Sequence, residues 1–198
     1  MSCFTTETAR KTRQRKAGLA AARYWPKHSF ENLERARIMK RRIILFLCTG
    51  NYYRSRFAEL LFNHLAPQNE LDCLATSRAL ELKLGAGNIG PISQNTVEAL
   101  VKRGIPLGEQ FRYPLALDEN DLAVASHIVA VKQDEHLPLL ERKFPRWAAR
   151  VEFWHVHDLD LAPPRKALAQ IDHNVRALIQ RLKSVTEFDD EGVKSNGM

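Results

Sequence analysis

The sequence predicts an α/β protein, a three-layer sandwich in which helices cover both faces of a four-stranded parallel sheet. The first observation is the apolar run RIILFLC at residues 42–48, which is typical of a strand buried on both faces. The second is that segments of strand character alternate with segments of helical periodicity from residue 42 to residue 183. Such alternation indicates parallel strands joined by crossover helices. A chain of 198 residues is long enough for one such domain with a buried core.

The first strand leads into the first helix through a Gly-Asn turn. Beyond the turn, apolar residues recur at the spacing of one helix face, namely Phe57, Leu60, Leu61 and Leu65. A strand, a short turn and an amphipathic helix are therefore expected to open the fold.

Six further elements follow. Ser93 is a candidate N-cap and Gly104 a stop signal for one of the helices, and Pro163 and Pro164 mark the start of the last helix. The predicted elements are a strand within residues 71–79, helices at 90–104 and 118–125, strands at 126–132 and 151–156, and a closing helix at 163–183.

Charge and composition divide the chain into three parts. Residues 1–38 contain nine Lys/Arg and three Asp/Glu, so they carry +6 of the net charge of +7. We interpret this leader as a basic extension that is disordered or precedes the native start at Met39, rather than as a nucleic-acid-binding arm. Residues 39–185 form the predicted domain, and residues 186–198 are expected to be a flexible acidic and polar tail.

The cysteines and the apolar runs indicate the compartment. Three widely spaced cysteines, Cys3, Cys48 and Cys73, fit neither a disulfide framework nor a zinc site. His155 and His157 alternate along a strand end, but no third ligand stands nearby, so no metal and no cofactor are expected. No apolar run approaches the roughly 20 residues of a membrane span. We expect a cytoplasmic protein without a membrane partner, monomeric or weakly dimeric.

The turn after the first strand has the features of an anion site. Cys48 lies at the carboxyl end of that strand, where ligands bind in open α/β sheets. Gly50 and Asn51 tolerate the left-handed backbone that turns successive N–H groups inward. The helix that begins near Arg54 adds unpaired N–H groups and the positive end of its dipole. Such a loop binds phosphate and favours the thiolate form of its cysteine.

Two side chains at the start of this helix extend the chemistry. Arg54 carries a planar fork of donors that can bind two phosphate oxygens at once. Ser55 can donate a hydroxyl proton to the Cys48 thiolate or to the departing sulfur. Cysteine, arginine and serine together argue against a purely structural role for Cys48.

The segment CTGNYYRS, residues 48–55, resembles the phosphate-binding signature of the low-molecular-weight protein tyrosine phosphatases, in which cysteine, five residues, arginine and serine follow the first strand. The similarity extends through GNIGPISQNTVEALVKRGI and DLAVASHIVAVKQDEH and covers roughly residues 41–183. A bare pattern of this kind is a weak signal, but its placement directly after a strand makes it specific. The resemblance implies the strand order 2-1-3-4.

The resemblance also implies a mechanism in two steps. The Cys48 thiolate attacks phosphorus, and water then hydrolyses the phosphocysteine. The loop from Thr49 through Gly50, Asn51, Tyr52 and Tyr53 to Arg54 and Ser55 binds the phosphate, and Asn51 braces it. In the family the general acid is an aspartate in the loop after the fourth strand. Counting from Trp154 selects Asp158, and Asp160 is the alternative acid.

This chain departs from the family pattern at three positions. Leu159 replaces the proline that usually follows the acid. Tyr53 stands where many members have a second cysteine, so a protective disulfide with Cys48 is not available there. Tyr52 is bulky, whereas the arginine-phosphate branch has a small threonine, which argues against that branch.

Three functions follow from these motifs. The first is a phosphatase acting on phosphotyrosine in proteins or on small aryl phosphates. The second is an arsenate reductase of the same fold, although Cys73 and Cys3 lack the pairing and spacing of a disulfide relay. The third is an inactive domain that binds phosphorylated ligands, which the altered acid loop leaves open.

Overall fold

The computed structural model describes residues 41–108, 111–156 and 164–194 of the chain. Side chains are described as far as residue 184. The predicted leader at residues 1–38 lies outside the described residues. The two candidate acids, Asp158 and Asp160, also lie outside them.

The four predicted strands form one parallel sheet in the order β2-β1-β3-β4, as expected. Their bounds are Arg42–Cys48 for β1, Cys73–Ala79 for β2, Ala125–Ala130 for β3 and Val151–Phe153 for β4. β4 is shorter than the strand predicted at residues 151–156. The chain nevertheless continues beside β3, since the amides of Trp154 and Val156 donate to the carbonyls of Ala130 and Val131 over 2.8 and 2.9 Å.

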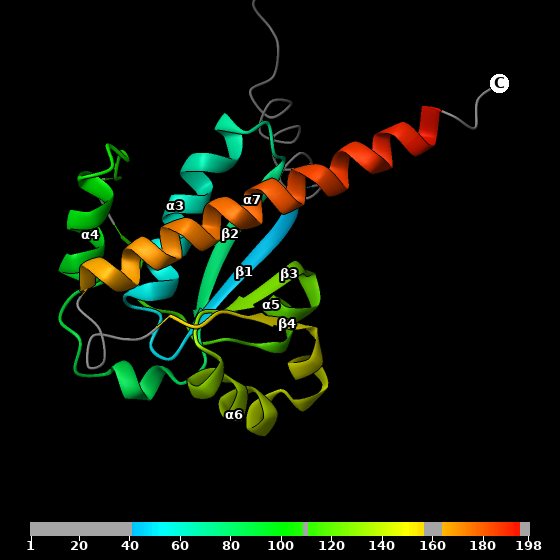
Figure 1. Cartoon of the computed structure of the whole chain (residues 1–198). Helices are drawn as coiled ribbons and strands as arrows, with labels where there is room; N and C mark the ends of the chain where they lie inside the picture. The colour runs from blue at the N-terminus through cyan, green and yellow to red at the C-terminus, as the bar shows by residue number, and fades with distance from the viewer. Residues whose placement is uncertain (1–40, 109–110, 157–163, 195–198) are drawn as a thin grey trace, which may run out of the picture. The chain divides into compact units, whose positions relative to one another are not determined.

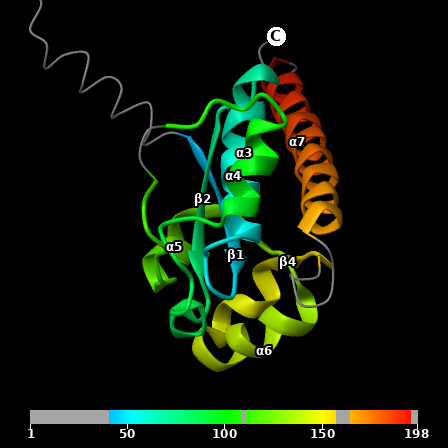
Figure 2. The ribbon, with the colours of Figure 1, turned by 90° about the vertical axis from the view of Figure 1, so that its left-hand side faces the viewer.

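Helices cover both faces of this sheet (Figures 1 and 2). The α-helices are α3 (Arg54–Gln68), α4 (Gln94–Val101), α5 (Glu119–Val124), α6 (Gln133–Lys143) and α7 (Pro164–Lys194), and the 3-10 helices are η2 (Leu82–Gly85) and η3 (Pro145–Arg150). Among the described residues, no helix is both long and apolar enough to cross a membrane.

The central strand β1 explains the three layers. Ile44, Leu45, Phe46 and Leu47 are fully buried, and successive side chains of a strand point to opposite faces. Ile44 and Phe46 pack in one core with α3, α4 and α7. Leu45 and Leu47 pack in a second core with α5 and α6. The apolar run therefore forms the middle of a three-layer α/β sandwich, as the sequence predicts.

Two helices differ from the expectation. α6 was not predicted, because Pro138 lies inside it and proline lacks the N–H that a helix interior uses. α7 continues to Lys194, well past residue 183, since no proline interrupts residues 165–194. The boundaries of α4 agree better: Ser93 occupies the N-cap position, although its side chain makes no capping hydrogen bond, and Gly104 adopts φ +68° beyond the helix.

Candidate active site

The loop between β1 and α3 lies at the carboxyl end of the sheet. β1 ends at Cys48 and α3 begins at Arg54, so five residues make the turn. β1 lies between β2 and β3 in the sheet, so the connections that leave β1 and enter β3 run in opposite directions along the sheet. The carboxyl end of β1 is therefore the topological switch point. Figure 2 shows the loop at the end of the sheet where α6 lies. The strand and helix thus hold a compact turn at the place where the sequence predicts an anion site.

Cys48 points into this turn and is held by two hydrogen-bonding groups. The amide N–H of Asn51 donates to Cys48 Sγ over 3.2 Å, and Ser55 Oγ lies 3.0 Å from the same sulfur. Both groups can stabilise negative charge on sulfur.

The Asn51 side chain determines which way the Ser55 proton points. Asn51 Oδ1 accepts hydrogen bonds from Arg112 Nη1 over 2.9 Å and from the Leu115 amide over 3.0 Å. Because both of these groups can only donate, the Nδ2 end of the amide must face Ser55 Oγ, 3.1 Å away, and Ser77 Oγ, 2.8 Å away. Ser55 accepts from Asn51, which leaves its own proton for Cys48 Sγ. Asn51 also adopts φ +51°, as the predicted left-handed turn requires.

Arg112, which no sequence motif marks, connects this network to the body of the domain. Its Nη2 donates to Glu59 over 2.8 Å and to the Ser77 carbonyl over 3.0 Å. The Ser77 hydroxyl in turn hydrogen-bonds Glu59. Burial lowers the pKa of Arg112, while the Glu59 carboxylate opposes that effect. Arg112 therefore orients Asn51 from behind the loop.

Arg54 is 1% exposed, and its guanidinium forms a two-point pair with Glu135 of α6. Nη1 donates to Oε2 over 2.9 Å and Nη2 to Oε1 over 2.8 Å, while Nη1 also donates to the Val156 carbonyl over 3.2 Å. Thr49 Oγ1 hydrogen-bonds the same carboxylate. The Glu135 carboxylate thus fixes the plane of the arginine at the mouth of the loop.

A buried histidine supports Glu135 in turn. His136 Nδ1 accepts a hydrogen bond from the Lys132 amide over 3.1 Å, so the ring proton is on Nε2, which lies 3.4 Å from Glu135 Oε1. Burial acts to raise the pKa of Glu135. Hydrogen bonds from His136, Arg54 and Thr49 outweigh burial and hold that pKa well below its usual range. Glu135 is therefore a carboxylate at physiological pH.

A cavity of about 230 Å³ opens in front of this turn. Six of the eight residues of the predicted loop line it, together with Glu135 and three residues from η2 and the segment after it. The lining residues are Cys48, Thr49, Gly50, Tyr52, Tyr53, Arg54, Leu84, Gly85, Asn88 and Glu135. Asn51 and Ser55 are buried behind the cavity. Tyr52 is half-buried at the rim, whereas Tyr53 is buried and its hydroxyl donates to the Pro164 carbonyl over 3.1 Å. Tyr53 is therefore mainly a packing residue.

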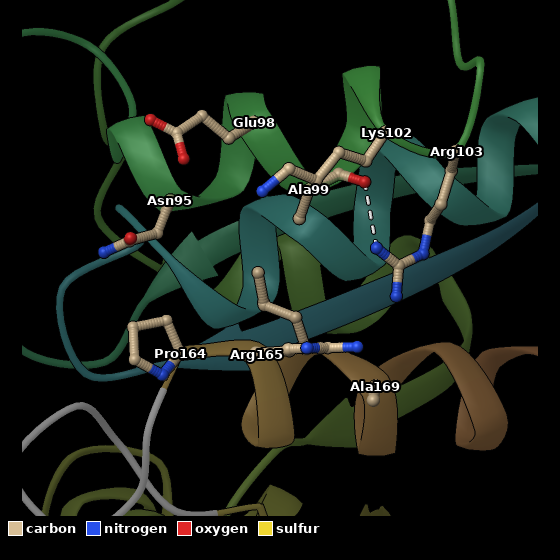
Figure 3. Close-up of a pocket in the computed structure, with 9 residues that line it drawn as sticks. Asn95, Glu98, Ala99, Lys102, Arg103, Pro164, Arg165 and Ala169 are labelled. Carbon is tan, nitrogen blue, oxygen red and sulfur yellow. Dashed lines mark hydrogen bonds between the residues drawn. The ribbon is translucent and has the colours of Figure 1, made fainter.

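A larger cavity of about 790 Å³ lies elsewhere, between α4 and α7. Figure 3 shows Glu98, Lys102 and Arg103 on its α4 side and Pro164, Arg165 and Ala169 on its α7 side. It contains neither Cys48 nor any other residue of the loop, so its size does not make it the reaction site. In the described part of the chain, no three His, Cys, Asp or Glu side chains are grouped to hold a metal ion.

Comparison with known proteins identifies the class that this fold and loop define. The family model described as low molecular weight phosphotyrosine protein phosphatase matches residues 43–187. The chain belongs to this family, and it is accordingly a cysteine-based phosphatase, a hydrolase. No curated protein matches the chain in a sequence comparison.

Solved structures agree with this assignment. A mutant of YwlE from Bacillus subtilis is 25% identical, with a TM-score of 0.59 over 72% of this chain and 99% of that one. The low molecular weight protein tyrosine phosphatase from T. tengcongensis is 26% identical, with a TM-score of 0.57 over 72% of this chain and 98% of that one. Wzb from Vibrio vulnificus in complex with benzylphosphonate, at 15% identity and a TM-score of 0.60 over 71% and 98%, shows the same fold.

Proposed function

We propose that the protein hydrolyses phosphomonoesters, with phosphotyrosine in proteins as its substrate class, through a phosphocysteine on Cys48. The observation that carries this proposal is the environment of the sulfur: an amide N–H at 3.2 Å and a hydroxyl at 3.0 Å converge on it. A cysteine with these two donors beside a buried arginine is suited to act as a thiolate nucleophile.

The proposed reaction has two steps. The Cys48 thiolate attacks phosphorus as the bond to the leaving oxygen breaks, and the loop amides and Arg54 stabilise charge on the equatorial oxygens. An acid donates a proton to the leaving oxygen, and its conjugate base then takes a proton from the water that hydrolyses the phosphocysteine. We assign this acid to Asp158, with Asp160 as the alternative. The Ser55 hydroxyl donates a hydrogen bond to the sulfur and stabilises the thiolate as it departs.

The depth of the site supports an aryl phosphate. Cys48 is buried at the base of the cavity, and Tyr52 forms part of its rim. A phosphate on a tyrosine ring stands farther from the peptide backbone than one on serine or threonine, so it reaches such a sulfur more readily. The aromatic face of Tyr52 offers a stacking partner for the substrate ring.

The positions of the cysteines favour a phosphatase over an arsenate reductase. Cys73 of β2 lies beside Arg42, the first residue of β1, whereas Cys48 is the last residue of β1. The two ends of β1 are about 20 Å apart along the strand. A disulfide requires the two Cα atoms to lie within about 7 Å. Among the described residues, Cys48 therefore has no cysteine partner for a disulfide relay.

The steady-state hydrolysis of para-nitrophenyl phosphate and of a phosphotyrosine peptide tests this proposal. We expect turnover of both by the full chain. Cys48→Ser should abolish turnover but retain binding of phosphate and vanadate, because the loop amides and Arg54 remain. The matched control is Cys73→Ala, which should keep its activity. Turnover by Cys48→Ser near the parent rate would contradict the mechanism, and arsenate reduction with thiol donors would favour the reductase.

Two other experimental outcomes would favour a different function or a different substrate. Absence of turnover with tight binding of phosphopeptides would indicate the inactive binding domain. Two of the similar structures carry the description YwlE arginine phosphatase, at 24% and 21% identity, which shows the fold alone. Faster hydrolysis of phosphoarginine than of phosphotyrosine would replace the proposed substrate, whereas the bulky Tyr52 leads us to expect the reverse.

A further inference from the structure

Large apolar side chains stand exposed beside the phosphate cavity. Ile89 is 90% exposed, Leu84 71% and Tyr113 68%, and Leu82 is also exposed. These four residues, Leu82, Leu84, Ile89 and Tyr113, are called the apolar rim below. Single exposed apolar residues need no explanation, but a group of them on a soluble protein marks an interaction surface.

The rim borders a shallow cavity that adjoins the phosphate cavity. This shallow cavity, of about 390 Å³, is lined by Leu82, Lys83, Gly85, Ala86, Asn88, Gly90, Tyr113 and Pro114. Gly85 and Asn88 also line the phosphate cavity. A polypeptide whose phosphate reaches Cys48 can therefore place its neighbouring residues beside the rim.

The segment that carries three of the four rim residues, Leu82, Leu84 and Ile89, is attached directly to the phosphate-binding loop. The backbones of Gly50 and Gly85 approach so closely that a Cβ on Gly85 would lie 3.2 Å from Gly50 Cα. The Tyr52 hydroxyl donates to the Ile89 carbonyl over 2.6 Å, and the Glu81 amide donates to the Thr49 carbonyl over 2.9 Å. The rim is consequently fixed relative to the reacting phosphate, as a docking surface for the same molecule requires.

We propose that the apolar rim binds the residues that flank the phosphorylated residue of a protein substrate, and that it selects apolar flanking residues. This inference rests on the proposed phosphatase function and specifies its substrate. Lys83 is the one charged residue among those that line the shallow cavity, so acidic or basic flanks find few partners there. In an extended peptide, residues one to three positions from the phosphorylated one lie within about 10 Å of it, which brings them over the rim.

Phosphotyrosine peptides with leucine, serine or aspartate flanks test the proposal on the full chain. We expect the leucine-flanked peptide to have the highest kcat/KM. Ile89→Glu and Tyr113→Glu should lower kcat/KM for that peptide by roughly tenfold or more, because a buried apolar contact is replaced by a charge. Hydrolysis of para-nitrophenyl phosphate, which has no flanking residues, should change little. Val101→Glu, on an exposed apolar residue of α4, is the matched control and should leave both rates unchanged.

The opposite results overturn the proposal. Equal kcat/KM values for the three peptides would do so, as would an equal loss in both variants for peptide and for para-nitrophenyl phosphate. A dimer that sedimentation detects and that Ile89→Glu dissociates, with peptide rates unchanged, would assign the rim to a second copy of the chain instead. If the protein hydrolyses neither substrate, the proposed function fails, and binding of the three phosphopeptides to Cys48→Ser still tests the rim separately.

Discussion

The Arg54 guanidinium and the Glu135 carboxylate are joined by two hydrogen bonds, of 2.9 Å from Nη1 and 2.8 Å from Nη2. Arg54 begins α3, whereas Glu135 lies in the first turn of α6, which follows β3. The pair therefore connects the two layers of helices across the carboxyl end of the sheet. It orients the arginine, but it also places a negative charge beside the cavity that receives the phosphate.

Glu135→Gln should separate these two effects. Glutamine offers one acceptor oxygen, and its NH2 group faces the donors of Arg54, so the guanidinium loses its fixed plane. We expect kcat for para-nitrophenyl phosphate to fall by roughly tenfold to a hundredfold, as the loss of an oriented oxyanion donor implies. Inhibition by phosphate should weaken much less, because the variant also removes a repelling charge.

The neighbouring Asp134→Asn provides the control. Asp134 is 78% exposed and pairs with Lys132 rather than with the loop. Its replacement should leave kcat and phosphate inhibition unchanged. An unaltered kcat in Glu135→Gln would show that Arg54 needs no carboxylate to hold it.

The contrast between Arg54 and Glu135 shows what the sequence predicts well. Cys48, Asn51, Arg54 and Ser55 belong to one turn, and the local order of residues fixes their contacts. Glu135 reaches the same turn only through the register of β1 with β3, over a sequence separation of 81 residues. In the sequence it is one acidic residue among many in a polar stretch.

The same distinction explains the other omissions. Arg112 contacts Asn51 across 61 residues, in a segment where neither periodicity nor a motif marks it. The central strand β1 is predicted from its continuous apolar run, because burial on both faces leaves a clear signal. α6 gave no such signal, since only His136 and Leu140 of its side chains are buried and Pro138 interrupts it. A helix that buries only a few side chains in the core has no clear apolar periodicity, so its sequence does not predict it.

Arg112→Met should impair both stability and catalysis. The variant deprives Asn51 Oδ1 of a donor and leaves the mostly buried Glu59 without its closest cation. We expect a loss of about 1–3 kcal/mol in the free energy of unfolding, measured in urea. We also expect the acidic limb of the kcat/KM profile to move to higher pH, because Ser55 is no longer directed at the sulfur.

Arg112→Lys and Arg146→Met distinguish this role from a general loss of charge. Lysine at residue 112 can donate to part of the network. The pH profile of kcat/KM for Arg112→Lys should therefore lie between those of the parent and of Arg112→Met. Arg146 is almost fully exposed and pairs with Glu119 at the surface, so its removal should change little. A reduced stability with an unshifted pH profile in Arg112→Met would make Arg112 a purely structural residue.

Glu152 should make the fold sensitive to acid. A hydrogen bond with His127 lowers its pKa, burial opposes this, and Trp154 and Arg181 donate to the same carboxylate, so that the pKa falls to about 2. The folded pKa is lower than the unfolded one, so the stabilisation is complete above about pH 5 and is lost as the pH falls toward 2. We expect Glu152 to account for on the order of 2 kcal/mol of the stability lost between pH 6 and pH 3.

Urea unfolding at pH 6 and pH 3 measures this contribution. Glu152→Gln should be less stable than the parent at pH 6 and should lose less stability on acidification. Glu141→Gln, on an exposed residue of α6, should follow the parent. An identical loss in the parent and in Glu152→Gln would assign the acid sensitivity to other carboxylates.

The general acid is the part of the mechanism for which the described residues give indirect support. The Val156 carbonyl accepts from Arg54 Nη1 over 3.2 Å, and the Pro164 carbonyl accepts from Tyr53 over 3.1 Å. Both ends of the intervening segment therefore contact the phosphate-binding loop. Asp158 is two residues from Val156, a span of at most about 7 Å, and this nearness in the chain is our reason for proposing it as the acid.

Asp158→Asn should keep the shape of the side chain and remove its proton. We expect kcat to fall by roughly a hundredfold to ten-thousandfold for phenyl phosphate, as the loss of a general acid implies. The fall should be smaller for para-nitrophenyl phosphate, whose leaving group departs more readily without a proton. Asp160→Asn is the matched variant and should lose much less. A larger loss in Asp160→Asn would move the acid by two residues, and full activity in both variants would remove the acid from this segment and favour the phosphate-binding domain.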